Sequence, residues 1–204
     1  MLSRSEMAKN YDLVISRVQS YSNLELMDEK ACVEDNLNAT KINEPTGLEL
    51  RLNNRNMFVL VEDVGEMSNI TSFCVSSNNL SSLPEYFKNN FPSLLSLDLE
   101  HNRFIKMPPC IFALTQLEHL NMAFNSIKTV PAEIASLTKI ESLLLHNNPI
   151  MSVDPAIRQL DQLYDLSIDW FSYVNLYGAE YFDKQHDPYR ISPRSIQSFK
   201  MEQY

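Results

Sequence analysis

The sequence predicts a solenoid in which short parallel strands stack rung upon rung around one core. Two observations predict it. Four asparagines, Asn78, Asn102, Asn125 and Asn148, recur at intervals of 24, 23 and 23 residues. Apolar residues then recur at fixed distances before and after each asparagine. A unit of this length cannot bury its apolar side chains alone, so successive units must stack on one another.

Each part of the unit has a physical role. Leu120 and Met122 lie two residues apart, which is the period of a strand with one buried face. We expect Asn125 to turn the chain out of the strand and to donate its amide to buried backbone carbonyls. Pro131 suits the first position of a short helix or turn. Apolar residues spaced three apart then pack the return segment onto the strands.

The same frame extends toward both ends of the chain. Arg55 stands at the asparagine position of an earlier unit, and Phe171 stands at that of a closing strand. The sequence therefore predicts five units plus a closing strand over residues 47–170. One unit has an extra residue near Asn90–Phe91. Asp154 replaces an expected proline, and we interpret it, with Arg55 and Phe171, as a sign of array ends.

The two terminal regions differ from the repeats. Residues 1–46 predict an N-terminal helical cap and linker, because apolar residues keep helical spacing on one face. This helix covers the first repeat or, in an alternative interpretation, docks on another protein. Residues 171–204 are rich in aromatic residues and predict a C-terminal cap and tail. Whether the chain is complete or part of a longer protein stays open.

Composition excludes several classes of partner. The 204 residues carry a net charge of −9 without a run of Lys or Arg, which argues against nucleic acid and anionic membranes. No stretch approaches the roughly 20 apolar residues that span a bilayer. The three cysteines are scattered, which favours a reduced, cytoplasmic protein. The glycosylation sequons, including that at Asn79, are interpreted as chance products of an asparagine-rich chain. We expect a monomer.

No motif in the sequence indicates catalysis or a cofactor. The three glycines are isolated, whereas phosphate-binding loops need clustered glycines. His101, His119 and His146 invite a metal hypothesis, but they fall at different places along their strands. His119 and His146 differ by four strand positions, roughly 13 Å, which is too far for shared coordination. The sequence therefore predicts no enzyme, no cofactor and no metal site.

A binding surface is expected on the concave side, where outward side chains of successive strands meet. The outward positions include Cys74, Ala123 and Ser167. Exposed aromatic residues ringed by carboxylates suggest a site for a basic protein partner with an apolar anchor. Trp170 has an alternative interpretation as part of the C-terminal cap. The candidate partner-binding residues are Asp98, Glu100, His101, Asn121, Phe124, Leu144, His146, Asp169 and Trp170.

The unit around Leu117, Asn125, Pro131 and Leu137 resembles the cytoplasmic 23-residue class of leucine-rich-repeat proteins, which includes Ras-pathway scaffolds and plant intracellular relatives. The resemblance implies an α/β fold: a right-handed solenoid shaped as a horseshoe arc. A short parallel sheet would line its concave face, with a helical or irregular convex side. It also implies a non-catalytic scaffold or adaptor in signal transduction. Alternatives are a targeting or regulatory segment of a larger signalling enzyme and a structural component of a cytoskeletal assembly.

Overall fold

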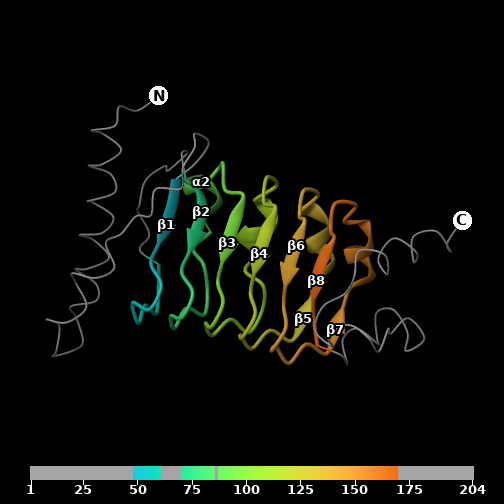
Figure 1. Ribbon diagram of the computed structural model, residues 1–204. Helices are drawn as coiled ribbons and strands as arrows, with labels where there is room; N and C mark the ends of the chain where they lie inside the picture. Colours follow the sequence, from blue (N-terminus) through green and yellow to red (C-terminus); the bar gives the residue numbers. More distant parts are fainter. Residues whose placement is uncertain (1–47, 61–69, 86, 170–204) are drawn as a thin grey trace, which may run out of the picture.

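The computed structural model describes residues 48–60, 70–85 and 87–169, and these form a parallel sheet of six short strands backed by short helical turns (Figure 1). The stacked array that the repeat predicts is confirmed. The predicted terminal caps, together with Trp170 and Phe171, lie outside the described residues. In order across the sheet, the strands are β1 (Leu48–Arg51), β2 (Ile70–Cys74), β3 (Ser96–Asp98), β4 (His119–Asn121), β6 (Ser142–Leu144) and β8 (Asp165–Ser167).

The strands pair in one register from β2 to β8. Their central residues, Phe73, Leu97, Leu120, Leu143 and Leu166, face one another across the sheet and are all buried. A shift of one residue would turn these apolar side chains outward, so the core fixes the register. Only between β1 and β2 does the register shift, next to Leu48 and Glu49.

Helical turns close the other side of the rungs that begin with β2, β3, β4 and β6. Three of them are 3-10 turns, η1 (Pro109–Ala113), η2 (Ala132–Ser136) and η3 (Pro155–Gln159), and the first is an α-helical turn, α2 (Phe87–Asn90). The rung with α2 contains the extra residue. Phe87 and Phe91, four residues apart, lie on one side of this turn. Their ring centroids lie 5.7 and 5.1 Å from that of Phe73, so the longer rung buries an aromatic cluster.

Asp154 has a local structural role that the sequence interpretation missed. Its side chain accepts a hydrogen bond of 2.9 Å from the backbone N–H of Ala156 and so caps η3. Aspartate is among the preferred residues at a helix N-cap, and Pro155 follows at the first position of the turn. Asp154 thus caps a turn in the last unit before the closing strand β8.

A second, two-stranded sheet was not expected. β5 (Thr129–Val130) pairs in parallel with β7 (Ser152–Val153), beside the carboxyl ends of the main strands (Figure 1). Its strands have two residues each, too few to show any periodicity in the sequence. They form because neighbouring rungs are already held at the strand spacing of about 4.8 Å.

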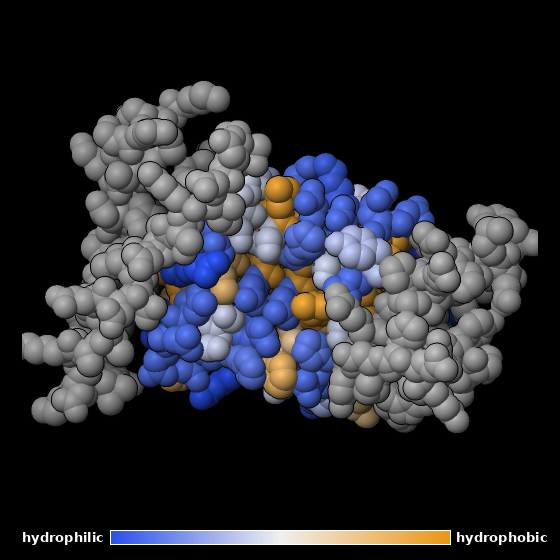
Figure 2. Space-filling model, in the orientation of Figure 1, coloured by the Kyte–Doolittle hydropathy of each residue, from blue (hydrophilic) through white to orange (hydrophobic). Residues whose placement is uncertain are grey.

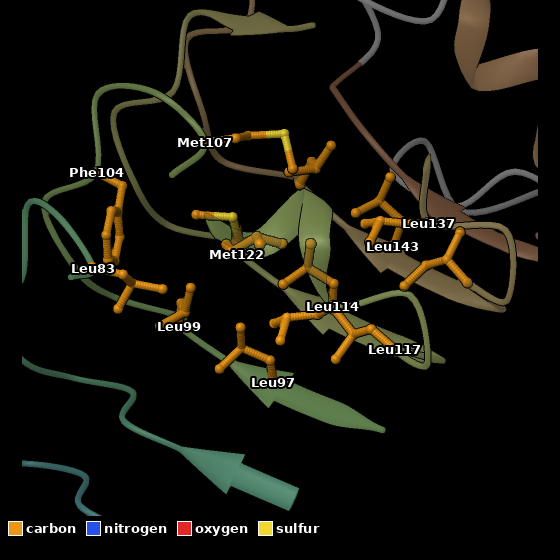
Figure 3. Packing of buried hydrophobic residues seen from close by; sticks show 14 of the residues in the cluster. Leu83, Leu97, Leu99, Phe104, Met107, Leu114, Leu117, Met122, Leu137 and Leu143 are labelled. Atoms are coloured by element: carbon orange, nitrogen blue, oxygen red, sulfur yellow. The ribbon is translucent and has the colours of Figure 1, made fainter. Parts of the chain in front are cut away.

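The core runs continuously along the array, from Leu50 in the first rung to Ile168 in the last. Each of the rungs that begin with β2, β3, β4 and β6 contributes residues from its strand, from the turn after it and from its return segment. Figure 3 shows Leu97 and Leu99 of one strand region converging with Phe104, Met107 and Leu114. In the described part of the chain, no helix has the length and apolar character needed to cross a membrane.

Candidate functional site

The ladder asparagines, Asn78, Asn102, Asn125 and Asn148, join neighbouring rungs through their side chains. All four are buried, with 4 to 9 % of each residue exposed. The Asn125 amide donates to the carbonyls of Met122 and Ala123 in its own rung, at 3.1 Å each. It also donates to the Leu99 carbonyl of the preceding rung at 3.0 Å. The predicted donation to buried carbonyls is confirmed.

The ladder asparagines also accept hydrogen bonds, which the sequence pattern did not predict. Oδ1 of Asn125 accepts a hydrogen bond of 3.0 Å from the backbone N–H of Phe104, two residues after the preceding asparagine. The other three asparagines make the same contact with their preceding rungs. Each side chain therefore satisfies backbone groups of two rungs, and these residues maintain the fold rather than contact a partner.

The residue just before each ladder position adopts a left-handed backbone conformation. The φ values are 55° at Asn54, 55° at Ser77, 51° at His101, 53° at Phe124 and 54° at Asn147. Their backbone N–H groups point along the array. His101 donates to the carbonyl of Ala123 at 3.1 Å, and Phe124 donates to that of His146 at 3.1 Å. We name these five positions the turn column. Their backbone N–H groups donate to the next rung, to a carbonyl in four cases and to the Asp169 carboxylate in the case of Asn147.

Three ring side chains meet on the sheet side of the turn column. The His101 ring stacks on Phe124, with centroids 4.2 Å apart and planes inclined by 17°. The edge-to-face contact of Phe124 with His146 has a centroid distance of 5.5 Å. Phe124 is 39 % exposed, so the predicted outward position of this residue is confirmed. His101, Phe124 and His146 form one aromatic strip across three rungs.

Two of the predicted histidines, His101 and His146, contact the same ring although they occupy different places in the repeat. His101 precedes its ladder asparagine by one residue and His146 by two. Both side chains reach Phe124 because it lies on the rung between them. His119 instead begins β4, at the other end of its strand. Within the described residues, no three His, Cys, Asp or Glu side chains converge as metal ligands would.

Two predicted carboxylates are held by the protein's own backbone. Asp98 Oδ1 accepts from the N–H of Glu100 at 3.0 Å, and Oδ2 accepts from the Cys74 thiol at 3.1 Å. Asp169 accepts from the N–H groups of Asn147 and Asn148 at 3.1 and 3.3 Å. Both carboxylates contribute negative charge to the surface, but their positions are fixed by intramolecular bonds.

Glu100 is the predicted carboxylate that adjoins the aromatic strip. Its Oε1 lies 3.7 Å from Nε2 of His101, an ion pair when that histidine is protonated. Its Oε2 accepts a hydrogen bond of 3.1 Å from the Asn121 amide. Asn121 in turn accepts from the N–H of Ala123 at 3.1 Å, so it supports Glu100 and the turn at once.

The remaining outward positions are less open than expected. Leu144 is half-buried on β6. Ala123 and Ser167, which the repeat frame places on the outer surface, are buried. Larger residues flank Ala123 in its column, and the Ser167 hydroxyl lies 3.0 Å from Nδ1 of His146. Figure 2 shows this side of the molecule as largely hydrophilic, with smaller hydrophobic areas near the middle of the array.

The two described thiols are protonated at neutral pH. Burial raises the pKa of Cys74, and the Asp98 carboxylate beside it acts in the same direction. Burial raises the pKa of Cys110 to about 11. Nucleophilic chemistry needs the thiolate. Neither cysteine therefore supplies a reactive group to this surface, and Cys74 is half-buried rather than fully outward.

Comparison with known proteins agrees with this geometry. Residues 92–150 match the protein family described as Leucine rich repeat. The described residues form a leucine-rich-repeat array. Human leucine-rich repeats and immunoglobulin-like domains protein 3 is 33% identical to this chain, over 37% of this chain and 9% of that protein. Bovine osteomodulin is 34% identical over 31% of this chain and 15% of its own length.

Among solved structures, a chain of the Drosophila Toll–Spatzle complex is similar, with a TM-score of 0.52 and 27% sequence identity. The similarity covers 59% of this chain and 17% of that one. The leucine-rich-repeat array thus spans less than a fifth of the length of each of these relatives. The matches concern the repeat itself and do not single out the cytoplasmic 23-residue class.

Proposed function

We propose that this chain is a non-catalytic scaffold or adaptor whose sheet face binds a protein partner through the aromatic strip. The observation that carries the proposal is the conformation of Phe124. A left-handed conformation costs most L-residues roughly 1–2 kcal/mol, and after glycine it is tolerated best by residues such as asparagine. Phe124 adopts it at a position where asparagine stands in two other rungs and the smaller or polar residues Ser77 and His101 stand in the remaining two. Strain of this kind is typical of functional sites.

The chemistry of the strip indicates the kind of partner. Large aromatic side chains are frequent anchors of protein interfaces, and Phe124 is held in place by a ring on either side. Carboxylates of Asp98, Glu100 and Asp169 belong to the same face. An apolar anchor packed on Phe124, beside a Lys or Arg near Glu100, would satisfy both features. The similar chain from the Toll–Spatzle structure supports a protein as the partner, because that structure is itself a complex.

The test is a substitution that suits the backbone and removes the ring. Phe124→Asn keeps a residue that tolerates the left-handed turn, so the variant should fold as the wild type does. Tyr164→Asn is the matched control, because Tyr164 is also an exposed aromatic residue (47 % exposed). It lies just before the first residue of β8, whereas the turn column lies beyond the last residues of the strands. Both variants and the wild type are used to capture partners from an extract of the native cells.

We expect a specific partner of the wild type to bind Phe124→Asn about thirtyfold more weakly, the effect of losing about 2 kcal/mol at an interface anchor. Binding to Tyr164→Asn should be unchanged. A partner that binds all three proteins equally well would overturn the proposed role of the strip. Loss of binding in both variants would mean that the sheet face as a whole, and not Phe124, had been disturbed.

We further propose that the protein works in a reducing compartment, as a member of the cytoplasmic 23-residue class. Cys74 and Cys110 support this, because both are free thiols and Cys110 is buried. The Asn79 side-chain amide, which glycosylation would modify, instead donates a hydrogen bond to the Asn56 side chain. Fractionation of native cells with glycosidase treatment tests the proposal. We expect the protein in the cytosolic fraction with unchanged mobility, and a glycosidase-sensitive shift would contradict it.

A further inference from the structure

A second surface lies along the edge of the array where the chain leaves the strands. It consists of the four residues after each of the five ladder positions, and we name it the flank. Its segments are residues 56–59, 79–82, 103–106, 126–129 and 149–152, and the last two of them reach β5 and β7 in Figure 1. The second residue of each segment is buried in the core. The others lie on the surface or partly so.

The flank carries most of the exposed large apolar side chains. In the described residues, six such side chains are strongly exposed, and four of them belong to the flank: Phe58 (57 %), Val59 (63 %), Ile105 (62 %) and Met151 (70 %). Phe58, Ile105 and Met151 occupy the same place in alternate rungs. With rungs about 4.8 Å apart, they form a row with a spacing of roughly 10 Å. Such a row is more than scattered surface hydrophobicity.

The charge of the flank is opposite to that of the chain. Arg103, Lys106 and Lys128 are exposed there, and the five segments contain no Asp or Glu. The chain as a whole has a net charge of −9. The Arg103 guanidinium lies 5.7 Å from the ring centre of Phe58, so a cation and an aromatic ring form one platform. The flank therefore combines positive charge with apolar anchors.

Backbone hydrogen bonds hold the flank rigid. The N–H groups of Asn79, Arg103 and Ser126 each donate to a carbonyl of the preceding rung at 2.8 Å. Met151 donates to the carbonyl of Lys128 at the same distance, and the β5–β7 pair continues this link. A surface whose backbone is already fixed loses little conformational entropy when a ligand binds.

We infer that the flank is a second binding surface, which takes an acidic amphipathic segment of a partner protein. Carboxylates of the segment would face Arg103, Lys106 and Lys128, and its apolar side chains would pack against the row from Phe58 to Met151. A helix suits this row, because residues seven apart rise by about 10.5 Å. Three cations are fewer than the clusters of about four to eight that typically bind anionic membranes, and the net negative charge opposes that contact. A peptide segment is therefore favoured.

The test uses a designed probe, a fluorescent 18-residue helical peptide rich in Glu with three Leu residues spaced seven apart. A second peptide has the same composition with the Leu residues moved to different faces. We expect the first to bind the full chain at least tenfold more tightly. Arg103→Glu with Lys128→Glu, and separately Ile105→Ser with Met151→Ser, should each weaken its binding at least tenfold. Fluorescence anisotropy at physiological salt measures both effects.

Matched variants control for total charge and for exposed apolar residues. Lys88→Glu with Lys139→Glu makes the same charge change on the return side, and Tyr164→Ser removes an exposed ring elsewhere. Neither should change peptide binding. Circular dichroism shows that each variant is folded. Equal binding of the two peptides, or equal weakening by flank and control variants, would overturn the inference.

Two other occupants of the flank are distinguishable in the same set of variants. Vesicles of phosphatidylcholine and phosphatidylserine are sedimented with each protein, and sedimentation velocity reports self-association. Flank-dependent vesicle binding without peptide binding would assign the surface to a membrane. Self-association that the flank variants abolish would assign it to a second copy of the chain. Either result overturns the peptide segment as the ligand. The sheet-face proposal is unaffected, because these variants leave the aromatic strip intact.

Discussion

Asn147 and Asn148 are neighbours of the same residue type with opposite roles. Asn148 is only 4 % exposed, and its amide donates to the carbonyls of Met122 and Leu145. Asn147 is exposed, and the repeat uses its backbone, which has a φ of 54°. The fold thus requires a particular side chain at the ladder position and only a particular backbone conformation in the turn column. The turn column can therefore vary, and there the protein places Phe124 and His101.

The largest contrast is expected between Asn148→Leu and Asn147→Leu. The first leaves the N–H of Ile127 and carbonyls of two rungs without partners, at about 1–3 kcal/mol for each buried group. We expect a loss of about 3 kcal/mol or more in the free energy of unfolding. Asn147→Leu should cost only about 1 kcal/mol, the backbone penalty. Urea unfolding followed by circular dichroism measures both, and equal losses would refute the distinction.

The Cys110 thiol reports whether the loss of a ladder side chain opens the array. Burial raises its pKa to about 11 from an ordinary value of 9.0, so the folded thiol at pH 8 holds about a hundredfold less thiolate. We expect slow alkylation of Cys110 in the wild type and in Asn147→Leu, and faster alkylation in Asn148→Leu. Peptide mapping by mass spectrometry separates this cysteine from the others. Equal rates in the two variants would contradict the expectation.

The same shift predicts how stability depends on pH. A raised pKa in the folded state means that the fold favours the neutral thiol. This contribution is fully present below pH 9 and is lost as the pH rises from about 9 toward 11, because the unfolded chain ionises first. Cys110→Ala should reduce the dependence of the unfolding free energy on pH in that range. An unchanged pH profile in Cys110→Ala would assign the dependence to other groups.

A smaller effect separates the ring of Phe124 from its backbone. Phe124→Ala and Phe124→Asn both remove the contacts with His101 and His146, so both lose the ring contribution. Asparagine tolerates the left-handed conformation better than alanine does. We expect Phe124→Asn to be more stable than Phe124→Ala by about 0.5–1 kcal/mol. Thermal unfolding of the two purified variants measures the difference, and a more stable alanine variant would exclude backbone strain at this position.

The smallest effect is expected at Ser77, an exposed member of the turn column with a φ of 55°. Ser77→Asn should raise stability by about 0.5 kcal/mol, because asparagine suits this conformation. For a chain of this size that corresponds to a rise of about 1–2 °C in Tm. Differential scanning calorimetry resolves such a change. A decrease in Tm would show that the turn column does not share one backbone requirement.

The architecture followed from the sequence because period and polarity are one-dimensional signals. The recurring asparagines and the alternating apolar residues determined the strands, their register and the buried ladder. Phe124 was also predictable as an exposed residue, since the neighbouring ladder positions keep regular asparagines. Composition excluded several classes of function, and the outward side chains of the repeat suggested a protein partner. Both statements stay predictions.

The tertiary structure decided which polar and aromatic groups meet. The sequence could not show that backbone N–H groups of other residues hold the carboxylates of Asp98 and Asp169, or that Asp154 caps a turn. It could not show that His101 and His146 flank one ring. Nor did it reveal the flank, where residues 23 or more apart align only after the rungs stack. The physical reason is that the direction of a side chain depends on the sign of φ and on contacts between rungs, and residue type alone fixes neither.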